Sequence, residues 1–211
     1  MKEIDVLPRF KPLSLKFPEI SIFSYNGKLK NELEKGEISE GQALNLFKAM
    51  VLVRNFEYMV TDLDTGRFTP YDGFRFYGAT HLYVGEEANA AGIMSSISKN
   101  DYITSTHRGH GHVICKGLFA IYEMNEDELN YFLRSASDDG FPIKKYGNNI
   151  EAAIDYHIFK AMSELLGKEE GYCHGRGGSM HIADYNTGNL GANAIVGGSL
   201  AIATGAAMAI Q

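Results

Sequence analysis

One stretch, residues 105–112, constrains what this chain can form more than any other. It holds three histidines, one arginine and two glycines, and follows the strand-like run 102–104. Arg108 is a permanent cation with a planar set of donors, and imidazoles can donate hydrogen bonds without a permanent charge. The glycines let the backbone approach a bulky ligand closely. A solvated polar turn is the alternative, but a turn gains little stability from these side chains, so we favour an anion site.

The composition is typical of a soluble globular protein. The 211 residues are 45% hydrophobic and 22% charged, which allows one large domain or two small ones. The net charge of -6 argues against nucleic acid as a partner through bulk electrostatics. Cys115 and Cys173 have no spacing typical of a metal knuckle or a disulfide framework. With no signal peptide and no apolar run long enough for a bilayer, we expect a cytoplasmic protein without a membrane partner.

The chain is expected to divide after residue 38. Residues 1–38 are predicted to form an N-terminal arm, because Pro8, Pro12 and Pro18 interrupt its first half. The arm could lie on a partner subunit or on the chain's own surface. Ser39 begins the first predicted helix, with Gln42 placed to complete a capping box. Residues 39–211 are then one domain.

Helices are predicted to alternate with the strand-like run at residues 102–104. They are expected over residues 39–63, 86–97, 113–116 and 150–166, and from Asn125 onward, with Gly117 and Gly167 as helix ends. This alternation favours an α/β fold in which helices flank a parallel sheet. Ligands in such folds bind at the carboxyl ends of strands, which is where residues 105–112 begin.

Two further regions could contact a ligand. His81 precedes the helix at residue 86 and is either a loop histidine held by backbone or a ligand contact, while Glu86 and Glu87 are expected to complement the helix dipole. Residues 175–181 and 189–198 are dense in glycine and other small residues. Such residues permit close approach to a ligand or to another backbone segment.

Taken together, four motifs resemble the α subunit of the thiamine-diphosphate-dependent 2-oxo acid dehydrogenases, the E1 component of pyruvate, branched-chain 2-oxo acid and acetoin dehydrogenase complexes. They occupy residues 81–88, 103–111, 175–181 and 191–197. The amino-acid sequences of these motifs are most similar to those of the acetoin and pyruvate branches of the family. The resemblance implies that residues 39–211 are part of a thiamine-diphosphate-binding domain, with a parallel sheet flanked by helices.

The resemblance also implies roles for single residues. His81 and Arg108 match positions that contact the cofactor diphosphate, and His107 stands where many pyruvate-type members have tyrosine. The backbone of Ala194 and Val196 matches the pair that hydrogen-bonds the aminopyrimidine ring. In this family the activating glutamate comes from the β subunit, so no catalytic residue is assigned in this chain.

The function implied is that of an E1 α subunit. It would act with an E1 β subunit in an α2β2 heterotetramer, use thiamine diphosphate and Mg²⁺ to decarboxylate or cleave a 2-oxo acid or acetoin, and pass the acyl group to the lipoyl group of E2. The family's magnesium motif is expected beyond Gln211. We therefore expect a fragment, a truncated product or a split subunit that is inactive alone, and the sequence leaves its substrate open.

Two alternatives remain. The chain could be a non-catalytic or truncated assembly subunit of the same fold. It could also be a metallohydrolase with imidazole ligands from His81, His107, His110 and His112, although a fixed cation such as Arg108 is unfavourable beside a metal. In the family interpretation, His110 and His112 are structural or support the residues that contact the cofactor.

Overall fold

The computed structural model describes residues 16, 18–22 and 24–210. The chain divides into two compact units, Met1–Ile38 and Ser39–Gln211. In the first unit, helix α1 (Leu29–Lys35) ends at Gly36, which has a φ of 74° and donates its N–H to the carbonyls of Glu32 and Leu33. Residues 1–15, 17 and 23 of the predicted arm, including Pro8 and Pro12, lie outside the described residues.

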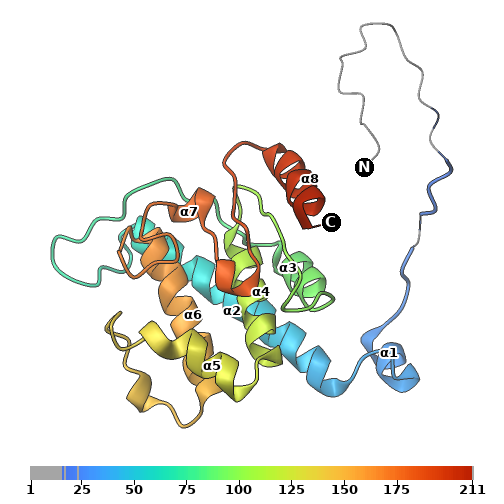
Figure 1. Ribbon diagram of the computed structural model, residues 1–211, viewed down its shortest axis with the longest axis horizontal. Helices are drawn as coiled ribbons and strands as arrows, with labels where there is room; N and C mark the ends of the chain where they lie inside the picture. Colours follow the sequence, from blue (N-terminus) through green and yellow to red (C-terminus); the bar gives the residue numbers. More distant parts are fainter. Residues whose placement is uncertain (1–15, 17, 23, 211) are drawn as a thin grey trace, which may run out of the picture. The chain divides into compact units, whose positions relative to one another are not determined.

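The second unit is built from helices (Figure 1). They are α2 (Glu40–Asp64), α3 (Glu87–Met94), α4 (His110–Glu123), α5 (Glu126–Phe132), α6 (Asn149–Leu165), α7 (Gly178–His181) and α8 (Gly198–Ile210), with the short 3-10 helices η1 (Leu133–Ser135), η2 (Ile143–Lys145) and η3 (Tyr185–Thr187). Helix α4 packs against α2, α3 and α6. It therefore lies at the centre of this unit.

Two helix starts and one helix end that are set by nearby residues lie where the sequence predicts them. Ser39 and Gln42 form a reciprocal capping box at the start of α2, and Asn125 and Glu128 form another at the start of α5. Gly167 follows α6 with a φ of 66°, a left-handed conformation that favours glycine. These three predictions are confirmed.

Gly117 does not end a helix, and that prediction was wrong. Helix α4 continues through it to Glu123. A Cβ atom at position 117 would lie 2.1 Å from Cε1 of the buried His157 ring on α6. The glycine therefore allows α4 and α6 to approach each other closely, and the contact, not a helix end, explains the residue.

Helix α4 contributes to two hydrophobic cores. In the first, Ile114 and Leu118 are buried with side chains of α2 such as Val53 and Val60. In the second, Ile121 is buried with aromatic and aliphatic side chains of α5 and α6. Burial of one such aliphatic side chain is worth about 1.5–3 kcal/mol. The two cores fix the start of α4, where residues 110–112 lie.

The expected parallel sheet is not confirmed, because no β-strand occurs among residues 24–210. The run 102–104 instead makes one parallel bridge, between Ile103 and Asn189. Ile103 donates its N–H to the Gly188 carbonyl and accepts the N–H of Leu190, both at 2.9 Å. Gly188 and Gly191 have positive φ angles of 80° and 125°. These glycines interrupt the extended backbone, so the pairing remains a single bridge.

No helix in the described part of the chain is both long enough and apolar enough to cross a membrane. Helix α8 has no charged residue but is only 13 residues long.

Candidate functional site

The rings of His81 and His107 pack against each other, and His107 lies just before the start of helix α4. They are arranged edge to face with their centroids 5.2 Å apart. The Nδ1 atom of each ring is buried and has no hydrogen-bond partner among the described residues. A buried polar atom without a partner costs free energy. Two such atoms on adjacent rings are therefore candidates for hydrogen bonds to a ligand.

Arg108 adjoins this histidine pair and joins two segments of the site. Its Nη1 atom donates to the carbonyl of Leu82 at 2.7 Å, which ties the loop after His81 to the start of α4. A guanidinium has five N–H donors. The arginine is half-buried, so it combines a structural bond with a permanent positive charge beside the two imidazoles.

His112 is held by protein groups on both sides of its ring. Its Nε2 atom lies 3.0 Å from the hydroxyl of Tyr83, and its Nδ1 atom lies 2.7 Å from the hydroxyl of Ser105. Burial lowers the pKa of His112 and raises the pKa of Tyr83 to about 12. The pair is therefore neutral near pH 7 and has a structural role.

His110 has a third set of partners, and all of them are buried. Its Nδ1 atom lies 2.8 Å from Oε1 of Glu57 on α2, and its Nε2 atom lies 2.8 Å from the hydroxyl of Ser179 on α7. His107, His110 and His112 thus face three different environments. In residues 24–210 no group of three His, Cys, Asp or Glu side chains converges on a metal position, so this geometry gives the metallohydrolase alternative no support.

The loop that contains Ala194 and Val196 lies against residues 104–109. Ser105 donates its N–H to the carbonyl of Gly191 at 2.9 Å. A Cβ atom on Gly109 would lie 2.8 Å from the Cβ atom of Ala192. Ala194 is half-buried and Val196 is exposed. The structure therefore brings His81, His107 and Arg108 together and places the loop of the other two predicted residues beside them.

Sequence reasoning missed Glu164, a fully buried residue of α6. Its Oε1 atom accepts the N–H groups of Gly177 and Gly178 at 2.7 and 2.9 Å. Its Oε2 atom accepts those of Cys173 and Gly175 at 2.7 and 3.0 Å. The glycine-dense loop thus folds around a carboxylate of the protein itself. One signal could have found it: Glu164 shares a helical face with apolar residues of the predicted helix.

Glu87 has a more specific partner than the helix dipole. It is buried at the start of α3 and accepts a hydrogen bond from Nε of Arg54 at 2.5 Å. The N–H of Gly85 donates to the same oxygen at 3.0 Å. The Arg54 guanidinium holds the pKa of Glu87 at about 2. This ion pair fixes α3 to α2 and so supports the loop that contains His81.

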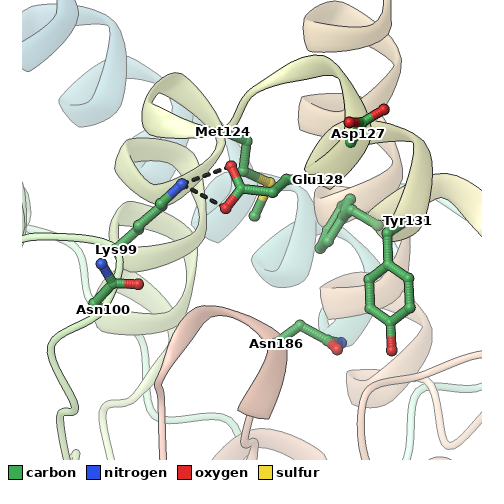
Figure 2. Close-up of a pocket in the computed structure, with 8 residues that line it drawn as sticks. Lys99, Asn100, Met124, Asp127, Glu128, Tyr131 and Asn186 are labelled. Carbon is green, nitrogen blue, oxygen red and sulfur yellow. Dashed lines mark hydrogen bonds and ion pairs between the residues drawn. The ribbon is translucent and has the colours of Figure 1, made fainter.

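A cavity of about 340 Å³ lies away from the histidine pair and contains none of the predicted site residues. Figure 2 shows Lys99 pointing toward Glu128 at its edge, with Met124 and Asn186 nearby. The Lys99 ammonium lies 2.6 Å from both carboxylate oxygens of Glu128. The polar groups of this pair therefore already satisfy each other.

Comparison with known proteins gives consistent similarities. Residues 70–129 match the model of the family described as dehydrogenase E1 component. The α subunit of acetoin:2,6-dichlorophenolindophenol oxidoreductase from Bacillus subtilis is 37% identical over 171 residues, and its counterpart from Cupriavidus necator is 34% identical over 168 residues. The chloroplastic pyruvate dehydrogenase E1 component subunit alpha-3 of Arabidopsis thaliana is 31% identical over 170 residues.

These matches cover most of this chain but a smaller part of each relative. They include 81%, 80% and 81% of the chain, and 38%, 37% and 29% of the three relatives respectively. The chain is therefore similar to dehydrogenase E1 α subunits and spans only part of their length.

Proposed function

We propose that residues 39–211 are part of a thiamine-diphosphate-binding domain and that the whole protein acts as an E1 α subunit. With an E1 β subunit in an α2β2 assembly, it would decarboxylate or cleave a 2-oxo acid or acetoin and pass the acyl group to the lipoyl group of E2. Support comes from the named relatives and from the unpartnered imidazole nitrogens of His81 and His107.

The donor set fits the tail of this cofactor. A diphosphate is a multiply charged anion that needs hydrogen-bond donors and positive charge. His81 and His107 each have a buried ring nitrogen without a partner, and Arg108 adds a cation beside them. When bound, thiamine diphosphate would supply a carbon nucleophile for the carbonyl group of the substrate and an electron sink for the bond that breaks.

In this proposal the residues of the chain bind and orient. His81, His107 and Arg108 hold the diphosphate, and the backbone of Ala194 and Val196 holds the aminopyrimidine ring. Orientation of this kind can account for a large part of a rate enhancement. Mg²⁺ would be bound with the diphosphate by ligands outside residues 39–211. The parallel bridge at Ile103 supports the further proposal that this segment belongs to a parallel sheet.

Pyrophosphate binding tests the site directly. Inorganic pyrophosphate would be titrated into the wild-type chain, co-expressed with its β subunit, and into the variants His81→Asn, His107→Asn and Arg108→Ala. Each replacement is expected to weaken binding several-fold, since each withdraws a donor from the anion. His174→Asn is the control, because His174 is exposed and has a φ of 54°, a conformation that asparagine tolerates.

Turnover tests the rest of the proposal. The αβ complex should decarboxylate a 2-oxo acid or cleave acetoin in the presence of thiamine diphosphate, Mg²⁺ and a dye acceptor. A stable complex without turnover would instead favour a non-catalytic assembly subunit. No saturable pyrophosphate binding by the complex, or equal weakening by the His174 control, would refute the anion site.

A further inference from the structure

A second feature of the site is a buried series of hydrogen-bonded polar side chains that ends at the backbone N–H of His81. Glu57 of α2, His110 of α4 and Ser179 of α7 are all buried. The links from Glu57 to His110 and from His110 to Ser179 are both 2.8 Å. The Ser179 hydroxyl then accepts the backbone N–H of His81 at 3.4 Å. We call these three side chains the Glu57–His110–Ser179 relay.

With Glu57 ionised and His110 neutral, the relay has one consistent direction. An ionised carboxylate can only accept, so Nδ1 of His110 donates to Glu57. The other nitrogen of a neutral imidazole, Nε2, is then an acceptor, and the Ser179 hydroxyl donates to it. The oxygen of Ser179 keeps its lone pairs for the N–H of His81. The carboxylate thus sets the imidazole tautomer, as partners of functional histidines do in other sites.

The relay is not the arrangement that stability alone would favour. Oε2 of Glu57 is buried and has no hydrogen-bond partner among the described residues. Apolar side chains of similar volume would avoid the cost of burying the carboxylate. The Ser179 end is also fixed from outside the relay, because the neighbouring Gly178 donates its N–H to Glu164 at 2.9 Å. These contacts therefore favour a role for the relay in orienting His81 over a role in stability alone.

We propose that Glu57, His110 and Ser179 are positioning residues for His81. By holding the backbone N–H of His81, the relay keeps its imidazole against that of His107, so that both rings can contact one anion. This inference rests on the proposed function, because it takes His81 to be a diphosphate ligand. The hydrogen bonds themselves are independent of any ligand, and they can be tested without one.

The test uses two readouts on the full chain. The first is hydrogen exchange of the His81 backbone amide in the ligand-free protein, with the ¹⁵N shifts of the His110 ring as a report of its tautomer. The second is the dissociation constant for inorganic pyrophosphate, from an NMR titration of the chain or its αβ complex. The variants are Ser179→Ala, Ser179→Thr and Glu57→Gln, with Ser163→Ala, a buried serine on α6, as the matched control.

Ser179→Ala is expected to accelerate exchange of the His81 amide and to raise the pyrophosphate dissociation constant about 2- to 10-fold, the range of one neutral hydrogen bond. Ser179→Thr keeps the hydroxyl and should restore both values. In Glu57→Gln the side-chain amide can present either its oxygen or its NH₂ group to His110. The His110 ring should then show a mixture of tautomers in place of one.

The outcomes separate this proposal from the proposed function. If Ser179→Ala behaves like Ser163→Ala in both readouts while pyrophosphate still binds, the positioning role is refuted and the anion site stands. If the wild type binds no pyrophosphate but His81 exchange responds to Ser179→Ala, the relay stands and the cofactor assignment fails. Covalent labelling of Ser179 by a fluorophosphonate probe would overturn the positioning role in favour of a nucleophile. If Ser179→Ala does not fold, Ser179→Thr and Glu57→Gln still decide the question.

Discussion

Glu164 accepts the backbone N–H of Gly177 at 2.7 Å, and this contact explains a glycine-dense loop that otherwise suggests a phosphate site. In a phosphate-binding loop the backbone N–H groups converge on a ligand anion. Here they converge on a carboxylate of the chain. A Cβ atom on Gly177 would also lie 2.7 Å from the carbonyl oxygen of His181. The glycine is required because the backbone of the turn that follows it, in α7, passes close to position 177.

The folded conformation of residues 173–178 should therefore depend on the charge of residue 164 more than on the shape of its side chain. Glu164→Gln keeps the volume but turns an NH₂ group toward two backbone N–H donors. We expect both Glu164→Gln and Glu164→Ala to lower the free energy of unfolding by at least about 3 kcal/mol, because buried donors lose a charged acceptor. Urea unfolding measures the change, with Ser163→Ala as the control. A loss below about 1 kcal/mol for Glu164→Gln would contradict this account.

The ion pair of Glu87 and Arg54 predicts a specific acid dependence. Arg54 lowers the pKa of Glu87 from its usual 4.5 to about 2. A carboxyl with a lowered pKa stabilises the fold above its unfolded value, and that stability is lost as pH falls toward the folded value. Glu87→Gln should therefore be less stable than wild type at pH 7, and the difference should shrink between about pH 4.5 and 2.

Urea unfolding at pH 7, 4.5 and 3 measures how the difference in the free energy of unfolding between wild type and Glu87→Gln changes with pH. The exposed neighbour Glu86 supplies the control variant Glu86→Gln, which removes the same charge without removing the contact to Arg54. A difference between wild type and Glu87→Gln that stays constant with pH would show that the ion pair does not stabilise the fold.

Two helical glycines should respond to alanine in opposite ways. Gly117→Ala places a methyl group against His157, whose ring is held by the hydroxyl of Tyr172 and the carbonyl of Val113. We expect a loss of about 1–3 kcal/mol from overpacking. Gly92→Ala in α3 meets no atom within 4 Å and should add about 0.5–1 kcal/mol through helix propensity. Thermal unfolding of both variants measures whether the melting temperature falls or rises. A change in the same direction for both variants would contradict the close contact between Gly117 and His157.

The two cysteines should differ in reactivity. Burial raises the pKa of the Cys115 thiol to about 12, so its thiolate fraction at pH 8 is on the order of 1,000-fold below that of a free cysteine. Cys173 is only half-buried. Alkylation by iodoacetamide, followed by peptide mass spectrometry, should modify Cys173 first and Cys115 only after unfolding in urea. Equal native rates would show that Cys115 is accessible.

The helix starts could be predicted because the contacts that define them are local. Ser39 and Asn125 each bond with a residue three positions ahead, so both partners appear together in the sequence. The same holds for the glycine that follows α6. The grouping of His81, His107 and Arg108 came instead from the resemblance to a known family, since no local pattern joins residues that are so far apart.

What the sequence left undetermined depends on tertiary contacts. Gly117 has the pattern of a helix end, but a ring from another helix occupies the space beside it. Glu164 lies on the apolar face of its helix, but the sequence does not show that the backbone of residues 173–178 closes over its carboxylate. The run 102–104 has the composition of a strand, yet glycines in its partner segment limit the pairing to one bridge. In each case the deciding atom lies on a different element.

The bridge between Ile103 and Asn189 also has a kinetic consequence. It closes a loop of roughly 90 residues, and the loss of chain entropy on closure is on the order of 4 kcal/mol by the logarithmic dependence on loop length. Helices α4 and α6 can gain their local contacts before this closure, but the loop beside Arg108 cannot. During synthesis, the segment before α4 cannot make this bridge until residue 189 has left the ribosome, and the proposed anion site should be among the last parts of the domain to form.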